Sequence, residues 1–330
     1  MVGRSHPLFD PRYFAVSRAR FTPFVAALTL GAVALVGCGE STGSGDSEAG
    51  SGPLAQVKVE GSDPAKEPTV TIAPKPLKLT GETKRVVTEG QGQAAAKTDM
   101  VSIKAQIVNG TDGKVVTSTW KEGQTLGIDL TDQQMLPLFT TQLPGSKPGS
   151  RLLIGAPTSD VYGPQGNTNL GLKAEDPILF VVDVVKVSTP LKEAEGAAVA
   201  PKAGLPTVKM NPGKAATITM PKTTPPTALV NQPLVTGKGD KVAKGQTIKV
   251  AYTGALWRDG KVFDSNATGY PTAIGVGAVV PGWDKAIVGQ TVGSRLLLVV
   301  PPADGYGAQG QGEIKGTDTM VFVVDILGAV

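Results

Sequence analysis

The chain has 330 residues, of which 18% are charged and 5% aromatic, and its formal net charge is +4. This length accommodates about two domains of roughly 100–200 residues each. Residues 1–37 hold four arginines and one aspartate, so the remainder carries 28 basic and 27 acidic residues. Because nucleic-acid binding requires clustered surplus positive charge, the balance excludes nucleic acid as a partner.

Histidine and cysteine are almost absent. His6 is the single histidine and Cys38 the single cysteine, so neither residue type follows position 38. Their absence excludes Ser-His-Asp and Cys-His catalysis, and any Cys/His zinc site, from the rest of the chain. The sequence therefore predicts no metal and no cofactor.

Residues 1–37 have the pattern of an export signal. Basic residues ending at Arg20 precede an uncharged apolar run from Phe21 to Gly37, as in secretory signal peptides. Leu35-Val-Gly-Cys38 resembles a bacterial lipobox, in which the cysteine receives lipid. We interpret residues 1–37 as a lipoprotein signal peptide and expect an extracytoplasmic protein, anchored to the cell membrane through Cys38. The alternative is an uncleaved membrane helix, which needs ~20 apolar residues.

Residues 38–67 are rich in Gly, Ser, Asp, Glu and Pro. Segments with few large apolar side chains bury too little surface to fold. The composition predicts a disordered tether between the membrane and the first domain.

An internal repeat follows the tether. Asp112-Gly-Lys-Val recurs 147 positions later as Asp259-Gly-Lys-Val, and Phe180-Val-Val-Asp recurs 142 positions later as Phe322-Val-Val-Asp. Matches in the same order with slowly changing offsets indicate two related units. We place the domains at residues 68–187 and 206–330, with residues 188–205 as an Ala-, Pro- and Lys-rich linker.

Both units show the same expected elements. In the first, Pro137–Leu143 predicts a short helix. In the second, the alternation in Thr247–Thr253 and the apolar runs Arg295–Val300 and Met320–Leu327 predict strands. Pro281–Gly289 predicts a helix, since proline suits its start and glycine its end. The expected fold class is α+β, with each antiparallel sheet packed on one short helix.

A series of short motifs occurs in order along the second unit: Tyr252-Thr-Gly, Gly260-Lys-Val-Phe-Asp-Ser, Val279-Val-Pro-Gly-Trp, Gly289-Gln-Thr-Val-Gly, Gly305-Tyr-Gly and Val321-Phe-Val-Val-Asp. This series resembles that of the FKBP family of peptidyl-prolyl cis–trans isomerases and covers essentially all of the second unit. The resemblance implies a twisted antiparallel sheet wrapped around a short helix, with the substrate pocket between them.

The resemblance also implies roles for particular residues. Apolar side chains would form the pocket: Trp283 its floor, Tyr252, Phe263 and Phe322 its aromatic walls, and Val279, Val280 and Ile314 its aliphatic walls. The Val280 N–H and the Tyr306 hydroxyl would each hold a substrate carbonyl, and Asp264 would be the lone carboxylate near the rotating bond. Tyr270 stands where the family often has Phe, and Thr272 replaces a second Phe, which makes one wall thinner.

These residue types suit isomerisation of an X–Pro bond. Amide resonance opposes rotation with a barrier of ~18–20 kcal/mol. Twisting the bond moves charge from the carbonyl oxygen back to nitrogen, so the transition state is less polar and tolerates a dry aromatic pocket better than the planar ground state does. Neither a nucleophile nor a metal is required.

The first unit lacks most of this set. By alignment of the repeat, Ala105, Val116, Thr117 and Phe139 replace Tyr252, Phe263, Asp264 and Trp283, whereas Tyr162 and Phe180 are retained. We interpret the first unit as a degenerate FKBP-like domain that acts as a spacer or binding module.

The predicted function is a prolyl isomerase that assists the folding of exported proteins at the cell envelope. Its predicted partners are proline-containing exported polypeptides and macrolide ligands of the pocket. One alternative is a non-catalytic FKBP-like lipoprotein that binds client or envelope proteins. A solute-binding lipoprotein is a third reading, but it requires a cleft between two lobes, and the repeat favours two self-contained domains.

Overall fold

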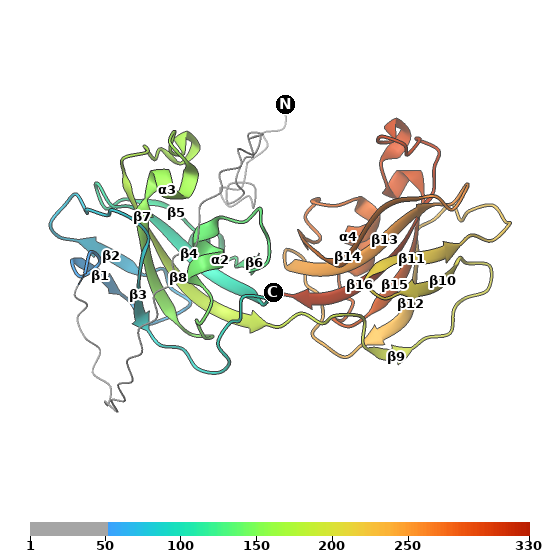
Figure 1. The fold of residues 1–330 in the computed structure, drawn as a ribbon, viewed down its shortest axis with the longest axis horizontal. Helices are drawn as coiled ribbons and strands as arrows, with labels where there is room; N and C mark the ends of the chain where they lie inside the picture. The colour runs from blue at the N-terminus through green and yellow to red at the C-terminus, as the bar shows by residue number, and fades with distance from the viewer. Residues whose placement is uncertain (1–51) are drawn as a thin grey trace, which may run out of the picture.

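Two β-sheets of six strands each organise the molecule, one in each half of the chain (Figure 1). The computed structural model describes residues 52–330. Alternating apolar residues in the strands bury one sheet face against a short helix, which confirms the predicted α+β class. Within residues 52–330, no helix is long and apolar enough to cross a membrane. The predicted signal peptide, residues 1–37, and Cys38 lie outside the described residues.

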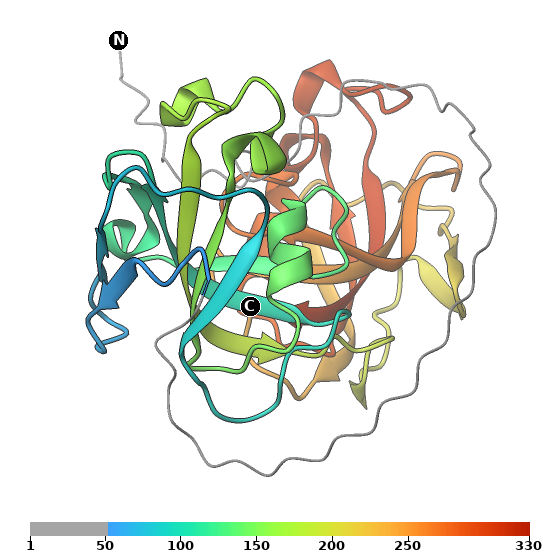
Figure 2. The ribbon, with the colours of Figure 1, turned by 60° about the vertical axis from the view of Figure 1, so that its left-hand side comes forward.

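The first domain has the strand order β3-β7-β8-β4-β5, with β6 also paired to β4. Figure 2 turns this domain toward the viewer and shows its strands as a curved sheet. Its elements are β3 (Thr83–Thr88), β4 (Met100–Asn109), β5 (Val115–Ser118), α1 (Thr119–Glu122), β6 (Leu126–Asp129), α2 (Pro137–Gln142), β7 (Arg151–Pro157), α3 (Thr158–Tyr162) and β8 (Pro177–Ser188).

The second domain repeats this arrangement in the strand order β14-β13-β16-β15-β12-β9. Strand β14 takes the place that β5 and β6 share in the first domain: β14 pairs with β13, and β5 and β6 both pair with the equivalent strand β4. The elements are β9 (Gly196–Ala198), β12 (Val230–Gly237), β13 (Thr247–Leu256), β14 (Val262–Ala273), α4 (Pro281–Ile287), β15 (Arg295–Val300) and β16 (Met320–Ala329). The predicted helices correspond to α2 and α4.

A β-hairpin covers the sheet face opposite the helix in each domain. Strands β1 (Val57–Glu60) and β2 (Thr69–Ile72) pack on the first sheet, and β10 (Thr207–Asn211) and β11 (Lys214–Thr219) pack on the second. Alternation along β8 shows the two faces: Phe180 joins the helix side and Val181 the hairpin side. The repeat therefore includes the hairpins.

Two predicted connections prove to be folded. Within the expected tether, Leu54 and Val57 are 3% and 1% exposed, because they fill the apolar space under the hairpin. Within the expected linker, Leu191 and Glu195 donate backbone hydrogen bonds to the second domain, and β9 pairs with β12. The composition of both segments is polar, but a few apolar residues and backbone pairing suffice to order them. Residues 52–67 and 190–198 are thus corrected to structured parts of the domains.

A buried ion pair joins the two domains. Lys249 Nζ in β13 lies 2.9 Å from Asp129 Oδ2 at the end of β6 and donates to Thr131 Oγ1 at 2.8 Å. The Asp129 and Lys249 side chains are 0% and 10% exposed. Close approach of the domains also depends on Gly127, since an added Cβ would lie 2.6 Å from the Cβ of Thr247. The domains therefore share a specific contact in addition to the connecting chain.

Asp129→Ala is expected to destabilise the full chain by about 3–5 kcal/mol, because it leaves the Lys249 ammonium buried without its counter-ion. Lys186→Ala is the matched control. It removes the exposed ion pair between Lys186 and Asp240, whose side chains are 39% and 76% exposed, and such pairs contribute about 0–1 kcal/mol. Urea unfolding of both variants measures the difference. Equal unfolding midpoints for the two variants would show that the buried ion pair contributes no more stability than the exposed one.

Candidate functional site

Five aromatic rings gather between the helix and the sheet of the second domain. The Trp283 ring, from α4, makes edge-to-face contacts with Tyr252 of β13 and with Phe322 of β16. The ring centroids lie 5.3 and 5.4 Å apart, respectively. Phe263 of β14 packs on Phe322 at 5.6 Å, and Tyr270 packs on Tyr252 at 6.1 Å. Edge-to-face pairs hold each ring in a defined orientation. The structure thus brings together five of the residues singled out in the sequence.

Local sequence places these rings. Tyr252 follows Ile248 and Val250 on the helix-facing side of β13, as expected from strand periodicity. Helix α4 begins with Pro281, whose fixed φ suits the first helical turn. Gly282 then lets the helix approach β15, since an added Cβ would lie 2.8 Å from the Val300 side chain. This close packing sets Trp283 against the sheet.

Polar groups lie beside the rings. The Tyr252 hydroxyl donates a hydrogen bond to Asp264 Oδ2 at 2.7 Å. Burial, and then this hydrogen bond to the carboxylate, raise the pKa of Tyr252 above its usual value. Burial and the charge of Asp264 also raise the pKa of Tyr306. Both phenols therefore stay protonated at neutral pH and act as hydrogen-bond donors near one carboxylate.

Burial decreases from the floor of the site to its rim. Trp283 is 4% exposed and Ile314 9%, whereas Tyr306 is 37% and Tyr270 42% exposed. Val279 and Val280 are partly buried against the same core. Val280 immediately precedes α4, and among the described residues its backbone N–H has no acceptor. A backbone donor therefore lies close to an aromatic site that is buried at its base and accessible at its edge.

Trp283 also carries an unsatisfied polar atom. Its indole Nε1 is buried, and no acceptor for it is found in the part of the chain that the structure describes. Most buried donors in folded proteins are paired. Trp283 is one of eight side chains with such an atom among the described residues, so this feature alone does not mark a functional site. This exception lies at the centre of the aromatic cluster.

Asp284 is a positioning residue that the sequence reasoning missed. Its carboxylate accepts hydrogen bonds from the backbone N–H groups of Gly275 at 2.6 Å and Gly277 at 2.8 Å. Both glycines have positive φ, +78° and +80°, which non-glycine residues rarely adopt. Asp284 thus holds the loop that leads into Val279. An acidic residue directly after the tryptophan, with a Gly-X-Gly segment just upstream, was the available signal.

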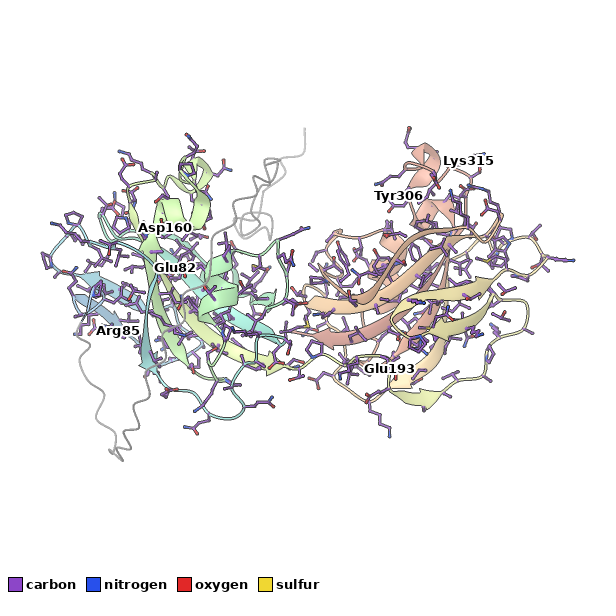
Figure 3. All side chains as sticks on the ribbon, viewed as in Figure 1. Glu82, Arg85, Asp160, Glu193, Tyr306 and Lys315 are labelled. Atoms are coloured by element: carbon purple, nitrogen blue, oxygen red, sulfur yellow. The ribbon has the colours of Figure 1, made fainter. Side chains whose placement is uncertain are left out.

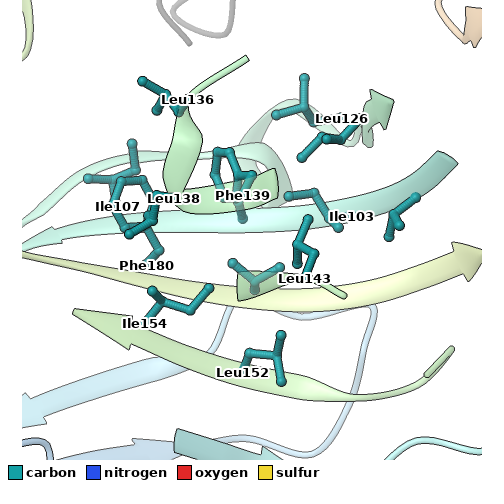
Figure 4. Close-up of a cluster of buried hydrophobic side chains, with 14 of the residues drawn as sticks. Ile103, Ile107, Leu126, Leu136, Leu138, Phe139, Leu143, Leu152, Ile154 and Phe180 are labelled. Carbon is teal, nitrogen blue, oxygen red and sulfur yellow. The ribbon is translucent and has the colours of Figure 1, made fainter. Parts of the chain in front are cut away.

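Buried hydrophobic side chains fill the corresponding region of the first domain, and Figure 4 shows this cluster with Phe139 and Phe180 in it. Phe139 of α2 packs edge-to-face on Phe180 of β8 at 5.5 Å, and Ala105 is fully buried. Tyr162 packs against this core, and its hydroxyl is buried without a partner among the described residues. In the second domain the equivalent Tyr306 is on the accessible rim. The positions that form the candidate site in the second domain are therefore part of the hydrophobic core in the first domain.

Known proteins resemble both halves. A family model described as FKBP-type peptidyl-prolyl cis-trans isomerase matches residues 91–185 and 238–327. FK506-binding protein 2 of Dictyostelium discoideum is 40% identical over 92 residues, which are 27% of this chain and 68% of that protein. The peptidyl-prolyl cis-trans isomerase FKBP53 of Arabidopsis thaliana is 36% identical over 107 residues. The match covers 31% of this chain and 22% of FKBP53, so this chain spans only a small part of that protein.

Two solved structures are also similar to part of this chain. The crystal structure of AtFKBP13 is 32% identical, with 32% of this chain and 96% of that chain covered and a TM-score of 0.30. FkpA from Escherichia coli is 35% identical, with 31% of this chain and 48% of that chain covered and a TM-score of 0.29. Since the family model covers more than half of the sequence, in two separate segments, this chain belongs to the family of FKBP-type peptidyl-prolyl cis–trans isomerases and carries the family domain twice.

Proposed function

We propose that the second domain catalyses cis–trans isomerisation of X–Pro bonds in exported polypeptides. The observation that carries this proposal is the buried Trp283 enclosed by Tyr252 and Phe322, with an accessible rim and few polar groups. A twisted imide is less polar than a planar one, so a water-poor aromatic site stabilises it relative to the ground state. A ~10⁶-fold acceleration requires about 8 kcal/mol of such differential stabilisation.

Three groups would orient the substrate. The Val280 N–H would hold one substrate carbonyl and the Tyr306 hydroxyl another. The Asp264 carboxylate already holds the Tyr252 hydroxyl, which keeps that wall in place and puts one negative charge beside the rotating bond. Each of these interactions is a single hydrogen bond or charge contact, so none is expected to dominate the rate.

Asp264→Asn and Tyr306→Phe should each lower kcat/KM for an X–Pro peptide by about 3- to 10-fold, since a net hydrogen bond contributes about 0.5–1.5 kcal/mol. Both changes conserve shape, and circular dichroism should be unchanged. Peptide isomerisation by the full chain provides the measurement. No turnover by the wild-type protein would instead support a non-catalytic FKBP-like module that binds client proteins.

The ligands proposed for the same pocket include macrolides. Several relatives are named FK506-binding proteins, and this chain keeps the aromatic set described above. Thr272 in β14 is 9% exposed, and it stands at the position where the family often has a second Phe. A smaller side chain at this place removes contact area from the wall, so we expect weaker macrolide binding than in a protein with Phe there.

We further propose that the protein acts outside the cytoplasm, attached to the membrane by lipid on Cys38. The support is the sequence alone: basic residues, an apolar run and a lipobox-like segment that ends at the single cysteine. Acyl chains contribute ~0.8 kcal/mol per buried CH₂, so more than one chain gives stable anchoring.

Cys38→Ala should abolish incorporation of radiolabelled fatty acid and leave an unprocessed precursor. Because the chain contains one cysteine, no other thiol can substitute for it. Cys38→Ser is a closer steric control and should behave in the same way. Labelling that persists in either variant, or that never occurs in the wild type, would contradict lipidation at this residue.

A further inference from the structure

A groove of about 300 Å³ lies on the face of the second sheet that is opposite α4. The turn of the β10–β11 hairpin and the segment entering the second domain form its sides, and strands β13, β14, β15 and β16 form its floor. The lining includes Met210, Lys214, Ala251, Ala267, Arg295 and Asp325. No residue proposed to bind the substrate through its side chain, other than Tyr252 at one edge, lines this groove.

The first domain shows what occupies the equivalent place. Residues 61–68, between β1 and β2, cross the outer face of its sheet. The Gly61 carbonyl accepts a hydrogen bond from Arg151 Nη1. The Pro64 carbonyl accepts from Lys104 Nζ at 3.0 Å and from Trp120 Nε1 at 3.1 Å. A proline-containing segment is thus bound there through the backbone carbonyls of Gly61 and Pro64, and it turns between Asp63 and Lys66, where the Lys66 N–H donates to the Asp63 carbonyl at 3.1 Å.

Glu67 adds a charged contact to that segment. Its carboxylate accepts from Gln106 Nε2 at 3.1 Å and lies 3.9 Å from Lys121 Nζ. The segment Gly-Ser-Asp-Pro-Ala-Lys-Glu-Pro therefore combines carbonyl recognition with an acidic side chain against basic and amide groups.

The second domain keeps the anchor and lacks the occupant. Arg295 Nε and Nη2 donate to Asp325 at 2.6 and 2.7 Å, as Arg151 Nε and Nη2 do to Asp183. In the second domain, however, the hairpin turn consists of Pro212-Gly213 in place of residues 61–68. Arg295 Nη1, whose counterpart binds Gly61, has no hydrogen-bond partner in residues 52–330.

Two large side chains are also replaced by small ones. At the repeat offset of 147, Lys104 corresponds to Ala251 and Trp120 to Ala267. Both alanines line the groove. Because the second domain has a short turn and two alanines here, the space that residues 61–68 and their two large neighbours occupy in the first domain is open as a groove.

Charge favours an acidic occupant. Lys192, Lys214 and Arg295 line the groove against Glu193 and Asp325, and Asp325 is already paired with Arg295. Neither Lys192 nor Lys214 forms an ion pair with any residue that the structure describes. Glu193 forms no ion pair among the described residues either, so the lining carries one surplus positive charge beside Arg295, whose counterpart Arg151 binds a carbonyl. A surplus positive charge matches an acidic peptide better than a basic or neutral one.

We propose that this groove binds an acidic, proline-containing segment of another polypeptide, in the manner in which the first domain binds its own residues 61–68. The site is separate from the aromatic pocket: Figure 3 labels Glu193, at the groove, and Tyr306, at the pocket rim, at opposite ends of the second domain. A client chain held at both places would bind with a raised effective concentration at each. Binding at the groove does not depend on the isomerase activity.

The probe is an acetylated and amidated octapeptide with the sequence of residues 61–68, titrated into the full chain labelled with ¹³C at its methionine methyl groups. Met210 lines the groove. Met320 reports on the aromatic pocket, because its methyl carbon lies 2.5 Å from where a Cβ on Gly305 would be, directly before Tyr306. The Met210 signal should shift and saturate. A shift confined to Met320 would place the peptide in the pocket and overturn the proposal, as would no shift at Met210.

Variants test the chemistry of the groove. Ala251→Glu puts a carboxylate on the floor and should weaken binding at least tenfold, and Lys214→Glu on the exposed turn should weaken it at least threefold. Lys209→Glu makes the same charge change in the same hairpin outside the lining, and at physiological salt it should stay within twofold of wild type. Equal affinities in all three variants would refute the site. So would peptide binding that appears only after removal of residues 1–51, because the chain's own N-terminal segment would then be the occupant.

Discussion

Trp283→Ala is expected to lower kcat/KM of the full chain by about 100-fold, equivalent to ~2.7 kcal/mol of transition-state free energy. The indole contacts both Tyr252 and Phe322, so its removal separates two walls and admits water to the place where the imide must twist. Water restores the advantage of the polar planar ground state. Peptide isomerisation measured beside circular dichroism separates this effect from unfolding.

Trp283→Phe is the matched control for this change. It keeps an aromatic ring and reproduces the residue that the first domain has at this place, Phe139. Loss of a buried Trp to Ala also costs about 3–5 kcal/mol of stability, and Trp→Phe costs less. We expect Trp283→Phe to retain activity between wild type and Trp283→Ala. A folded Trp283→Ala variant with wild-type kcat/KM would remove Trp283 from the mechanism.

The first domain alone should fold cooperatively and show no isomerase activity, and the second alone should carry essentially all of it. Phe139 and Phe180 close the first core, and its Tyr162 hydroxyl is buried, whereas Tyr306 remains at an accessible rim. Without an open site there is no surface on which a twisted imide is favoured. Turnover by the first domain comparable to that of the second would show that its remaining rings suffice.

The structure also sets where the chain should be cut for this experiment. The first fragment should begin at residue 52, because Leu54 and Val57 are part of its core. The second should begin near Pro190, because Leu191 and β9 bond to the second sheet. Separation exposes Lys249 to water along with the rest of the interface. It should therefore cost the second domain less than Asp129→Ala costs the intact chain, where the lysine stays buried.

The sequence by itself predicted the repeat, the fold class, the helices α2 and α4, and the aromatic residues that cluster around Trp283. Strand alternation such as Ile248, Val250 and Tyr252 is a local pattern of period 2, and the proline at the start of α4 acts on its own φ, so neither depends on distant residues. The motif series in the second half then identified the rings that the tertiary structure brings within contact of Trp283.

Only the tertiary structure decided the features that depend on pairing between distant segments. The strands β1 and β9 come from segments whose polar composition favours disorder, and they are ordered because a sheet face and a sheet edge were available to them. The ion pair between Asp129 and Lys249 joins residues 120 positions apart, and the groove exists because a turn, two alanines and an arginine from separate strands meet. Contacts of this kind leave no local pattern, since burial and partner choice are set by the packing of whole domains against one another.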